Sequence, residues 1–187
     1  CYGNKLKKLN VTKNKKLKNL TCGDNQLPSL DVSKNTALTI LHCHHNKLKS
    51  LNVTKNPKLF SLSCDRNPIK KLNISNNKKL RYLGCSGCEL TALDINAQPL
   101  LRELSCGENL LTKLDTSKNP RLHRIYCSSN RLSELHLENN ILLDTLVCDN
   151  NDLTELDLSF GGSYFCSLGF SARENPSLTV IVAPEIY

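Results

Sequence analysis

The sequence predicts a mostly β solenoid, a single domain in which one unit of 21 residues is repeated eight or nine times. The first observation behind this prediction is a cysteine ladder, because eight of the ten cysteines in the 187-residue chain fall at a constant interval of 21 residues. They are Cys1, Cys22, Cys43, Cys64, Cys85, Cys106, Cys127 and Cys148. A constant interval marks one structural position that recurs, whereas disulfide frameworks pair cysteines at irregular spacings.

The second observation is that other residue types keep the same period. An asparagine stands three residues after most ladder cysteines, a Leu or Ile follows two residues later, and a further Leu comes three residues after that. The asparagines are Asn4, Asn25, Asn46, Asn67, Asn109, Asn130 and Asn151. The unit reads L-x-x-L-x-C-x-x-N-x-L-x-x-L-D-V-S-x-N-x-x. No such unit buries its own apolar face, so stability must come from stacking on its neighbours.

The third observation concerns the elements inside one unit. Alternation around each cysteine, as in Leu20-Thr21-Cys22, predicts a short strand. Successive strands stack in parallel at about 4.8 Å. The asparagine after the cysteine is expected to point inward and bond the backbone. The Asp/Asn-Val-Ser/Thr-x-Asn segment favours turns, and 21 residues leave room only for short extended or 3₁₀ segments on the convex side.

The repeats are predicted to cover residues 1–160. Residues 161–187 are expected to form an irregular insertion plus a final repeat, which acts as a C-terminal cap of the same domain. The insertion, at about 161–174, contains Tyr164, Phe165, Cys166 and Phe170. These side chains are expected either to fold back over the last strand or to form an exposed aromatic binding loop.

The register of the final repeat is predicted from one short match. Gly169 stands where the next ladder cysteine is due, and residues 175–178 match residues 56–59. This alignment makes Asn175 the counterpart of Asn56 and places Ala183 in the cysteine column.

The ladder thiols are predicted to be buried and reduced, because parallel stacking keeps neighbouring Cβ atoms about 4.8 Å apart, whereas a disulfide needs about 3.8 Å. Cys85-Ser86-Gly87-Cys88 also forms a CxxC motif, which elsewhere binds zinc or carries out redox chemistry. Since Cys88 replaces an inward asparagine, both thiols are expected in the core. No cofactor is predicted.

The outward positions of the strands are expected to form a ligand-binding concave face. For each ladder cysteine they are the residues three and one before it and one, two and four after it. The candidate ligand-binding residues are His42, His44, His45, Asp65, Arg66, Tyr82, Glu103, Arg124, Tyr126, Arg131 and Asp149. A mixed polar surface with exposed Tyr and Arg suits recognition of a protein or glycan.

Three histidines are the only cluster that suggests chemistry. His42 and His44 project on one face, and Asp65 lies one strand from His44. A surface zinc or copper site at these three residues is the alternative to solvated recognition residues. No nucleophilic triad, carboxylate pair or phosphate loop is visible, so the sequence predicts a protein that is not an enzyme.

Charge is distributed unevenly along the chain. Residues 1–81 contain 18 Lys and Arg against 3 Asp and Glu, a net charge of +15, whereas residues 82–187 contain 7 against 14, a net charge of −7. The basic half could attract an anionic polymer, or its charge could simply keep the protein soluble. Nucleic acid is disfavoured because no aromatic side chains alternate with the lysines. No apolar stretch approaches the roughly 18 residues of a membrane helix, so membrane insertion is not predicted.

Over residues 1–160 the L-x-C-x-x-N-x-L-x-x-L-D-V-S-x-N unit resembles the short, 21-residue class of bacterial leucine-rich repeats. Similar cysteine ladders occur in internalin-like proteins of Gram-positive pathogens and in cell-surface leucine-rich-repeat proteins of anaerobes. The resemblance implies a right-handed leucine-rich-repeat solenoid with a parallel sheet on its concave face. It also implies a secreted or cell-surface recognition module that binds a protein or glycan there, the chain being a piece of a longer protein whose export signal lies elsewhere. Two alternatives are an electrostatic adhesin that binds anionic polymers through the basic N-terminal half, and a passive spacer.

Overall fold

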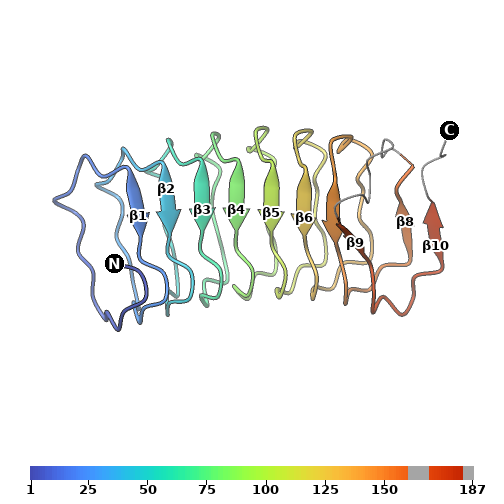
Figure 1. Ribbon diagram of the computed structural model, residues 1–187, viewed down its shortest axis with the longest axis horizontal. Helices are drawn as coiled ribbons and strands as arrows, with labels where there is room; N and C mark the ends of the chain where they lie inside the picture. The colour runs from blue at the N-terminus through green and yellow to red at the C-terminus, as the bar shows by residue number, and fades with distance from the viewer. Residues whose placement is uncertain (160–168, 183–187) are drawn as a thin grey trace.

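A computed structural model describes residues 1–159 and 169–182, which form a row of stacked turns (Figure 1). Eight short strands make one parallel sheet in the order β1-β2-β3-β4-β5-β6-β7-β9, and β8 pairs with β10 in parallel. Their bounds are β1 Asn19–Thr21, β2 Ile40–His42, β3 Ser61–Ser63, β4 Tyr82–Gly84, β5 Glu103–Ser105, β6 Arg124–Tyr126, β7 Thr145–Val147, β8 Glu155–Asp157, β9 Gly169–Ser171 and β10 Val180–Val182. The described residues contain no helix, and the predicted mostly β solenoid is confirmed.

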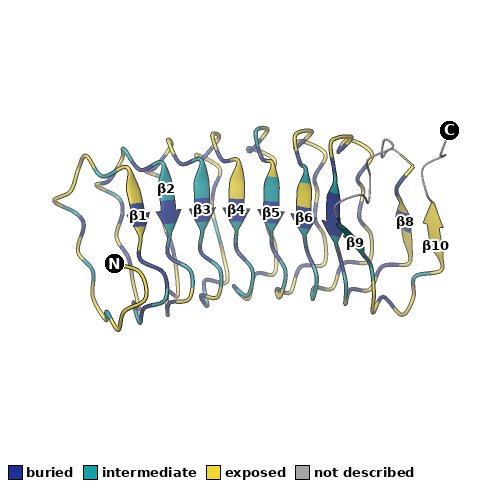
Figure 2. Ribbon diagram, viewed as in Figure 1, coloured by how far each residue is buried: buried dark blue, intermediate teal, exposed yellow. Residues whose placement is uncertain are grey.

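Equivalent residues of successive turns stack in columns, because neighbouring strands pair without a shift. Leu41 lies opposite Leu62, and Leu62 lies opposite Leu83. These leucines and the ladder cysteines point inward, and Cys43 and Cys64 are fully buried. The core is therefore a line of apolar columns along the solenoid, with exposed and half-buried residues outside it (Figure 2).

The parallel strands give the solenoid two edges. The chain comes into every strand of the large sheet at one edge, which we call the upstream edge, and leaves at the other, the downstream edge (Figure 1). At the downstream edge the residue two after each ladder cysteine has a left-handed backbone. These residues are Gly3, Asp24, His45, Arg66, Gly87, Glu108, Ser129 and Asn150, with φ between 50° and 68°. This conformation turns the chain out of the sheet and costs about 1 kcal/mol for a residue other than glycine.

The asparagines three residues after the ladder cysteines hold the downstream edge together. Asn67 Nδ2 lies 3.1 Å from Cys43 O and 2.9 Å from Cys64 O, and Asn67 Oδ1 accepts from Leu48 N at 3.0 Å. The same contacts recur at Asn25, Asn46, Asn109, Asn130 and Asn151, which with Asn67 we call the downstream asparagines. Each one links two turns, and the predicted inward orientation is confirmed for these six; Asn4, in the first turn, is exposed and bonds only Cys1 O and Tyr2 O.

A second amide column lies inside the upstream edge. We call its members the upstream amides, and they are Asn35, Asn56, Asn77, Gln98, Asn119 and Asn140, all fully buried. Asn56 Nδ2 donates to Val32 O at 3.1 Å and to Asn35 O at 2.9 Å, both in the preceding turn. No described residue donates to the side-chain oxygens of the first five members. The sixth differs, because Thr116 Oγ1 donates to Asn140 Oδ1 at 2.6 Å.

The convex turns follow the predicted local chemistry. Asp31 Oδ1 accepts from Ser33 N at 2.9 Å. Asn35 N then donates to Val32 O, and Leu38 N donates to Asn35 O. Hydrogen bonds between residues three apart are the 3₁₀ pattern, but here they form isolated turns rather than helical segments.

The predicted register of the last repeat is wrong. Asn175 Nδ2 lies 3.1 Å from Cys148 O and 3.0 Å from Ala172 O, and Asn175 Oδ1 accepts from Leu153 N at 3.2 Å. These are the contacts of a downstream asparagine, and Glu174 before it has the matching left-handed φ of 55°. Asn175 is therefore the counterpart of Asn151, and Ala172, a smaller apolar residue, takes the place of the ladder cysteine.

The insertion is consequently shorter than predicted, because 24 residues separate Cys148 from Ala172, three more than one repeat. Phe170 lies on β9 opposite Leu146 and packs, partly buried, against the core. Tyr164, Phe165, Cys166 and Ala183 lie outside the described residues. The division at residue 160 and the cap formed by 161–187 therefore stay predictions.

Candidate recognition surface

The centre of the sheet face is a shallow hollow with a floor of small side chains. By sheet face we mean the outward side chains of the eight-stranded sheet and of the loops that leave it. Ser63, Gly84 and Ser105 lie in the floor of the hollow, whose volume is about 220 Å³, and Tyr82 and Glu103 stand at its margin. Tyr82 is 41% exposed. The hollow is therefore open, with an aromatic ring beside it.

A hydrogen-bonded series runs from this hollow toward the N-terminus. Ser63 Oγ donates to Asp65 Oδ2 at 2.7 Å, and His44 Nδ1 lies 3.2 Å from Ser63 Oγ. His44 Nε2 lies 3.7 Å from Asp24 Oδ2, and His45 Nδ1 lies 3.1 Å from Asp24 Oδ1. Since the Ser63 hydroxyl gives its only proton to Asp65, His44 is the donor in their contact. A catalytic serine would instead pass its proton to the imidazole, so this series does not supply an activated nucleophile.

Two glycines allow this arrangement. A Cβ at residue 84 would lie 2.5 Å from Asp65 Oδ2, and one at residue 23 would lie 2.7 Å from His44 Nε2. Across Gly23, the ring of Tyr2 approaches that of His44 to 5.7 Å. Tyr2 was missed in the sequence, although it stands one residue after a ladder cysteine and thus in the column of His44. A hydrogen bond from Tyr2 lowers the pKa of Asp24, and the two histidines act in the same direction.

His42 lies apart from these residues. Its Nε2 is 3.0 Å from Ser61 Oγ, and burial, followed by the charge of His44, lowers its pKa. In the part of the chain that the structure describes, no three His, Cys, Asp or Glu side chains are placed to hold a metal ion. The alternative metal site at His42, His44 and Asp65 is therefore not assembled, because serine hydroxyls and Asp24 take the groups that would have to converge.

Arg124 is the centre of a second polar group on the sheet face. Its guanidinium lies 3.4 Å from Glu103 Oε2 and 3.9 Å from Asp144 Oδ1. These residues and Tyr82 line a further hollow of about 160 Å³. Tyr126 is half-buried on β6, the strand that also carries Arg124. Asp144 was missed because it stands four residues before its cysteine, outside the columns that were considered.

The remaining candidates lie at the downstream edge. Arg66 contacts Glu108 at 3.4 Å across two turns. Asp149 accepts hydrogen bonds from Ser171 Oγ and from Arg173 N, and Arg131 is exposed. The eleven candidates thus form three groups, the histidine group, the Tyr82–Arg124 group and the downstream loops, rather than one site.

The thiols of the ladder lie away from all three groups. Burial raises the pKa of Cys22 to about 11 and that of Cys106 to about 12. Cys88 is 1% exposed, and its Sγ donates to Cys64 O at 3.3 Å. All described cysteines are free, as predicted, and both thiols of the CxxC motif lie in the core. The described cysteines other than Cys1 are buried and so offer no accessible thiolate, whereas Cys1, predicted to be buried, is exposed.

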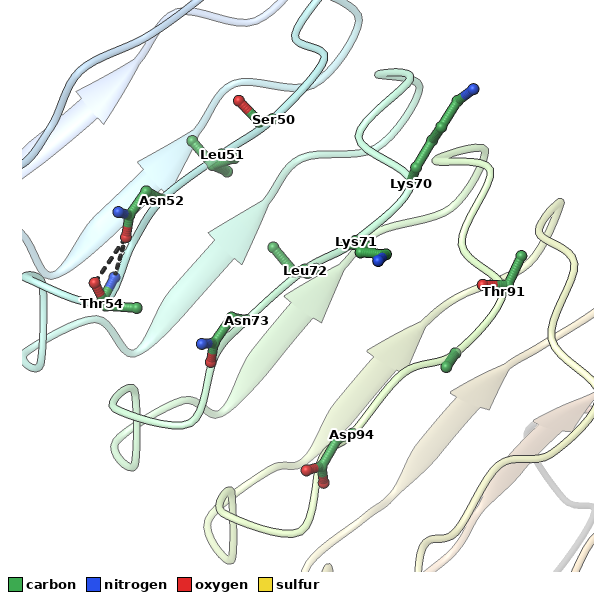
Figure 3. A pocket seen from close by; sticks show the side chains of 11 residues that line it. Ser50, Leu51, Asn52, Thr54, Lys70, Lys71, Leu72, Asn73, Thr91 and Asp94 are labelled. Carbon is green, nitrogen blue, oxygen red and sulfur yellow. Dashed lines mark hydrogen bonds between the residues drawn. The ribbon is translucent and has the colours of Figure 1, made fainter.

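A third hollow, of about 500 Å³, lies on the flank behind the sheet, across three successive turns (Figure 3). Leu51 and Leu72 line it, and Thr54 turns its N–H and hydroxyl toward Asn52 Oδ1 at 3.1 and 2.7 Å. Lys70 points away from it toward solvent. Because its polar groups bond one another rather than converge, this hollow is a weaker candidate than the sheet face.

The period of 21 residues, the inward leucine columns and the parallel sheet together define a leucine-rich-repeat solenoid with a cysteine ladder. No protein-family model and no curated protein sequence matches the chain. Solved structures do match. The functional domain of InlJ from Listeria monocytogenes, which includes a cysteine ladder, is 32% identical with a TM-score of 0.80 over 97% of this chain and 47% of that one.

Two further solved structures agree in fold. A leucine-rich-repeat protein from Leptospira interrogans is 23% identical, with a TM-score of 0.76 over 95% of this chain and 52% of that one. The internalin InlF from Listeria monocytogenes is 19% identical, with a TM-score of 0.64 over 91% and 62%. The chain thus spans about half the length of the first two structures. Its structural neighbours are internalin-like bacterial leucine-rich-repeat proteins, and this likeness suggests a protein-interaction module.

No helix in the described residues is long and apolar enough to span a membrane.

Proposed function

We propose that the chain is the non-catalytic recognition module of a bacterial surface or secreted protein, and that it binds a protein or glycan on its sheet face. The observation that carries this proposal is the open hollow beside Tyr82, floored by Ser63, Gly84 and Ser105. A floor of small residues lets a side chain or sugar of the ligand approach the strands closely.

The groups around the hollow have the chemistry of a binding centre. Tyr and Arg are the residue types that most often dominate binding energy at protein interfaces. Tyr82 is exposed, and the side chain of Arg124 is 49% exposed although Glu103 and Asp144 hold its guanidinium. A side chain that is already oriented loses less conformational entropy when a ligand binds.

The test is binding of the chain to an array of extracellular host proteins and neutral glycans, followed by titration of each hit against variants. Combining Tyr82→Ala with Arg124→Ala should weaken a true sheet-face ligand by more than about tenfold. The matched control combines Lys71→Ala with Thr91→Ala, which changes the hollow behind the sheet and also removes one positive charge.

An array without any hit would contradict the proposal and favour a passive spacer. A hit that both double variants bind as well as the parent chain would place recognition elsewhere on the molecule. Thermal unfolding of each variant shows whether a loss of binding is a loss of fold.

A further inference from the structure

Some of the basic side chains form a row along the upstream edge, and this row extends beyond the basic N-terminal half of the chain. In the two columns four and six residues before the ladder cysteines, seven residues are Lys or Arg and all are exposed. They are Lys16, Lys18, Lys58, Lys79, Arg81, Arg102 and Arg121, which we call the upstream ridge. The two columns contain no Asp or Glu from residue 16 to residue 142, and the next member, Asp144, pairs with Arg124 on the sheet face.

The backbone shows that the column next to the strands is continuous. Phe60 N donates to Thr39 O at 2.9 Å, Arg81 N to Phe60 O at 2.8 Å, and Arg102 N to Arg81 O at 2.8 Å. Adjacent turns are therefore about 4.8 Å apart along the ridge, the spacing of hydrogen-bonded strands. Each turn from that of Lys58 to that of Arg121 contributes at least one cation to the ridge, which thus continues into the half of the chain whose net charge is negative.

These cations have no ionic partner in the part of the chain that the structure describes. The ion pairs of Lys and Arg found there involve Arg66, Lys70 and Arg124, none of which belongs to the ridge. The nearby carboxylates have other partners: Glu103 and Asp144 contact Arg124, and on the convex turns Asp31 and Asp115 accept hydrogen bonds from Ser33 and Ser117. Unpaired cations in a row create a positive field that only an external anion can neutralise.

The ridge also contains a hollow of about 620 Å³. Lys58, Lys79 and Arg81 line it together with the apolar side chains of Phe60 and Leu100. The ring of Phe60 is half-buried and meets Tyr82 edge-on, at 6.4 Å between ring centres. An apolar surface among cations suits a sugar ring, whose C–H face packs on it while acidic substituents reach the charges.

We propose that the upstream ridge binds a linear anionic polysaccharide, aligned along the solenoid axis. One sugar of a 1,4-linked chain advances by roughly the distance between two turns, so acidic groups on successive sugars can reach the cations of successive turns from Lys58 to Arg121. Single-stranded nucleic acid fits less well, because it needs a series of aromatic platforms and Phe60 is the only aromatic residue among the ridge columns other than His123. A DNA duplex curves away from a straight row of charges after a few phosphates.

The experiment is titration of the chain with a size-defined heparin oligosaccharide at several salt concentrations. The variant Lys58→Ser, Lys79→Ser, Arg81→Ser should bind at least about tenfold more weakly and with a smaller salt dependence. The matched control, Lys8→Ser, Lys49→Ser, Lys71→Ser, removes the same charge from exposed positions of the N-terminal half outside the ridge, and its affinity should change less than about twofold.

A second variant separates the ridge from the N-terminal half. Arg102→Ser with Arg121→Ser changes only residues beyond position 81, and on this proposal it weakens heparin binding by about fivefold. Equal losses in the ridge and control variants, or an unchanged affinity of the Arg102/Arg121 variant, would overturn the proposal. A DNA duplex of equal charge that competes as well as heparin would reassign the ridge to nucleic acid.

The proposal does not depend on the function proposed for the sheet face. The variant Tyr126→Ala, on β6 of the sheet face and three turns from Phe60, should keep its heparin affinity, and the Lys58/Lys79/Arg81 variant should keep its sheet-face ligand. Failure of one proposal therefore leaves the other to be judged on its own measurement.

Discussion

The two edges of the solenoid use the same residue type in different ways. At the downstream edge, an asparagine amide uses both of its atoms, as Asn67 does with Nδ2 on Cys43 O and Oδ1 on Leu48 N. At the upstream edge, Asn56 uses Nδ2 in the same manner, but no described residue donates to its Oδ1. Asn67 and Asn56 thus have the same period and are equally buried, but we expect Asn67 to contribute more to stability.

The surfaces of the two edges differ in the same sense. The upstream ridge presents cations without carboxylates, whereas the downstream loops alternate signs, with Arg66 against Glu108 and Lys70 against Glu89. At the downstream edge the buried amides use both their nitrogen and their oxygen in hydrogen bonds, and surface charges form ion pairs. At the upstream edge five buried amide oxygens have no donor among the described residues, and the ridge cations have no ionic partner there. We therefore expect substitutions at the downstream edge to destabilise the fold more than substitutions at the upstream edge.

The largest predicted effect follows from replacing one asparagine at each edge. Asn109 Oδ1 accepts from both Cys88 N and Leu90 N, at 3.0 and 2.9 Å. Asn109→Ala leaves these buried N–H groups without an acceptor and should lower the free energy of unfolding by more than about 3 kcal/mol. Asn56→Ala removes only donors and also eliminates an unpaired oxygen, so its cost should be about 1–2 kcal/mol. Urea unfolding of both variants measures the difference, and equal costs would remove the distinction between the edges.

The next predicted effect concerns Asn140, the upstream amide whose side-chain oxygen accepts a hydrogen bond from a described residue. Thr116 Oγ1 lies 2.6 Å from Asn140 Oδ1 and 3.1 Å from His136 O. Thr116→Val makes this turn equivalent to its neighbours, in which the amide oxygen has no donor, and should cost about 1 kcal/mol of unfolding free energy. The double variant with Asn140→Ala is the control, because the cost of losing the hydroxyl should shrink once its acceptor is gone.

The converse substitution should supply a hydrogen-bond donor to an upstream amide oxygen that lacks one. Val53 stands 24 residues before Asn77, as Thr116 stands 24 residues before Asn140. Burying a hydroxyl in place of a methyl group normally costs about 1–3 kcal/mol, but Val53→Thr places a donor beside the unpaired Asn77 Oδ1. We expect a stabilisation of up to about 1 kcal/mol, measured by urea unfolding. A destabilisation of about 1–3 kcal/mol would instead show that Asn77 Oδ1 already accepts a hydrogen bond in solution.

Much of this molecule could be predicted because its sequence repeats. The inward position of Leu62 and Cys64 follows from the period alone, and so does that of Asn67. The final repeat was misaligned because Ala172 replaces the cysteine that marked every earlier turn, although Phe170, Ala172 and Asn175 still fit the L-x-C-x-x-N pattern. A repeat anchored on one conspicuous residue type is lost where that residue changes.

The candidate site was harder to predict for a different reason. The column rule gave correct directions for His44, Tyr82 and Arg124, but contacts between columns depend on side-chain reach. Tyr2 meets His44 only because Gly23 lies between them. The upstream ridge was missed because charges were counted along the chain, whereas residues 21 apart are neighbours in space.

The smallest predicted effect is a dependence of stability on pH that comes from His42 on the sheet face. Burial lowers the pKa of His42 below the ordinary value of 6.5. As pH falls below 6.5, the unfolded chain takes up a proton that the folded chain resists, so the free energy of unfolding decreases until the lower pKa of the folded state is passed. Above pH 6.5 the imidazole is neutral in both states and has no effect. His42→Gln should therefore reduce the loss of thermal stability between neutral and mildly acidic pH. If thermal unfolding across this pH range shows the same loss in the His42→Gln variant as in the parent chain, a group other than His42 causes the acid sensitivity.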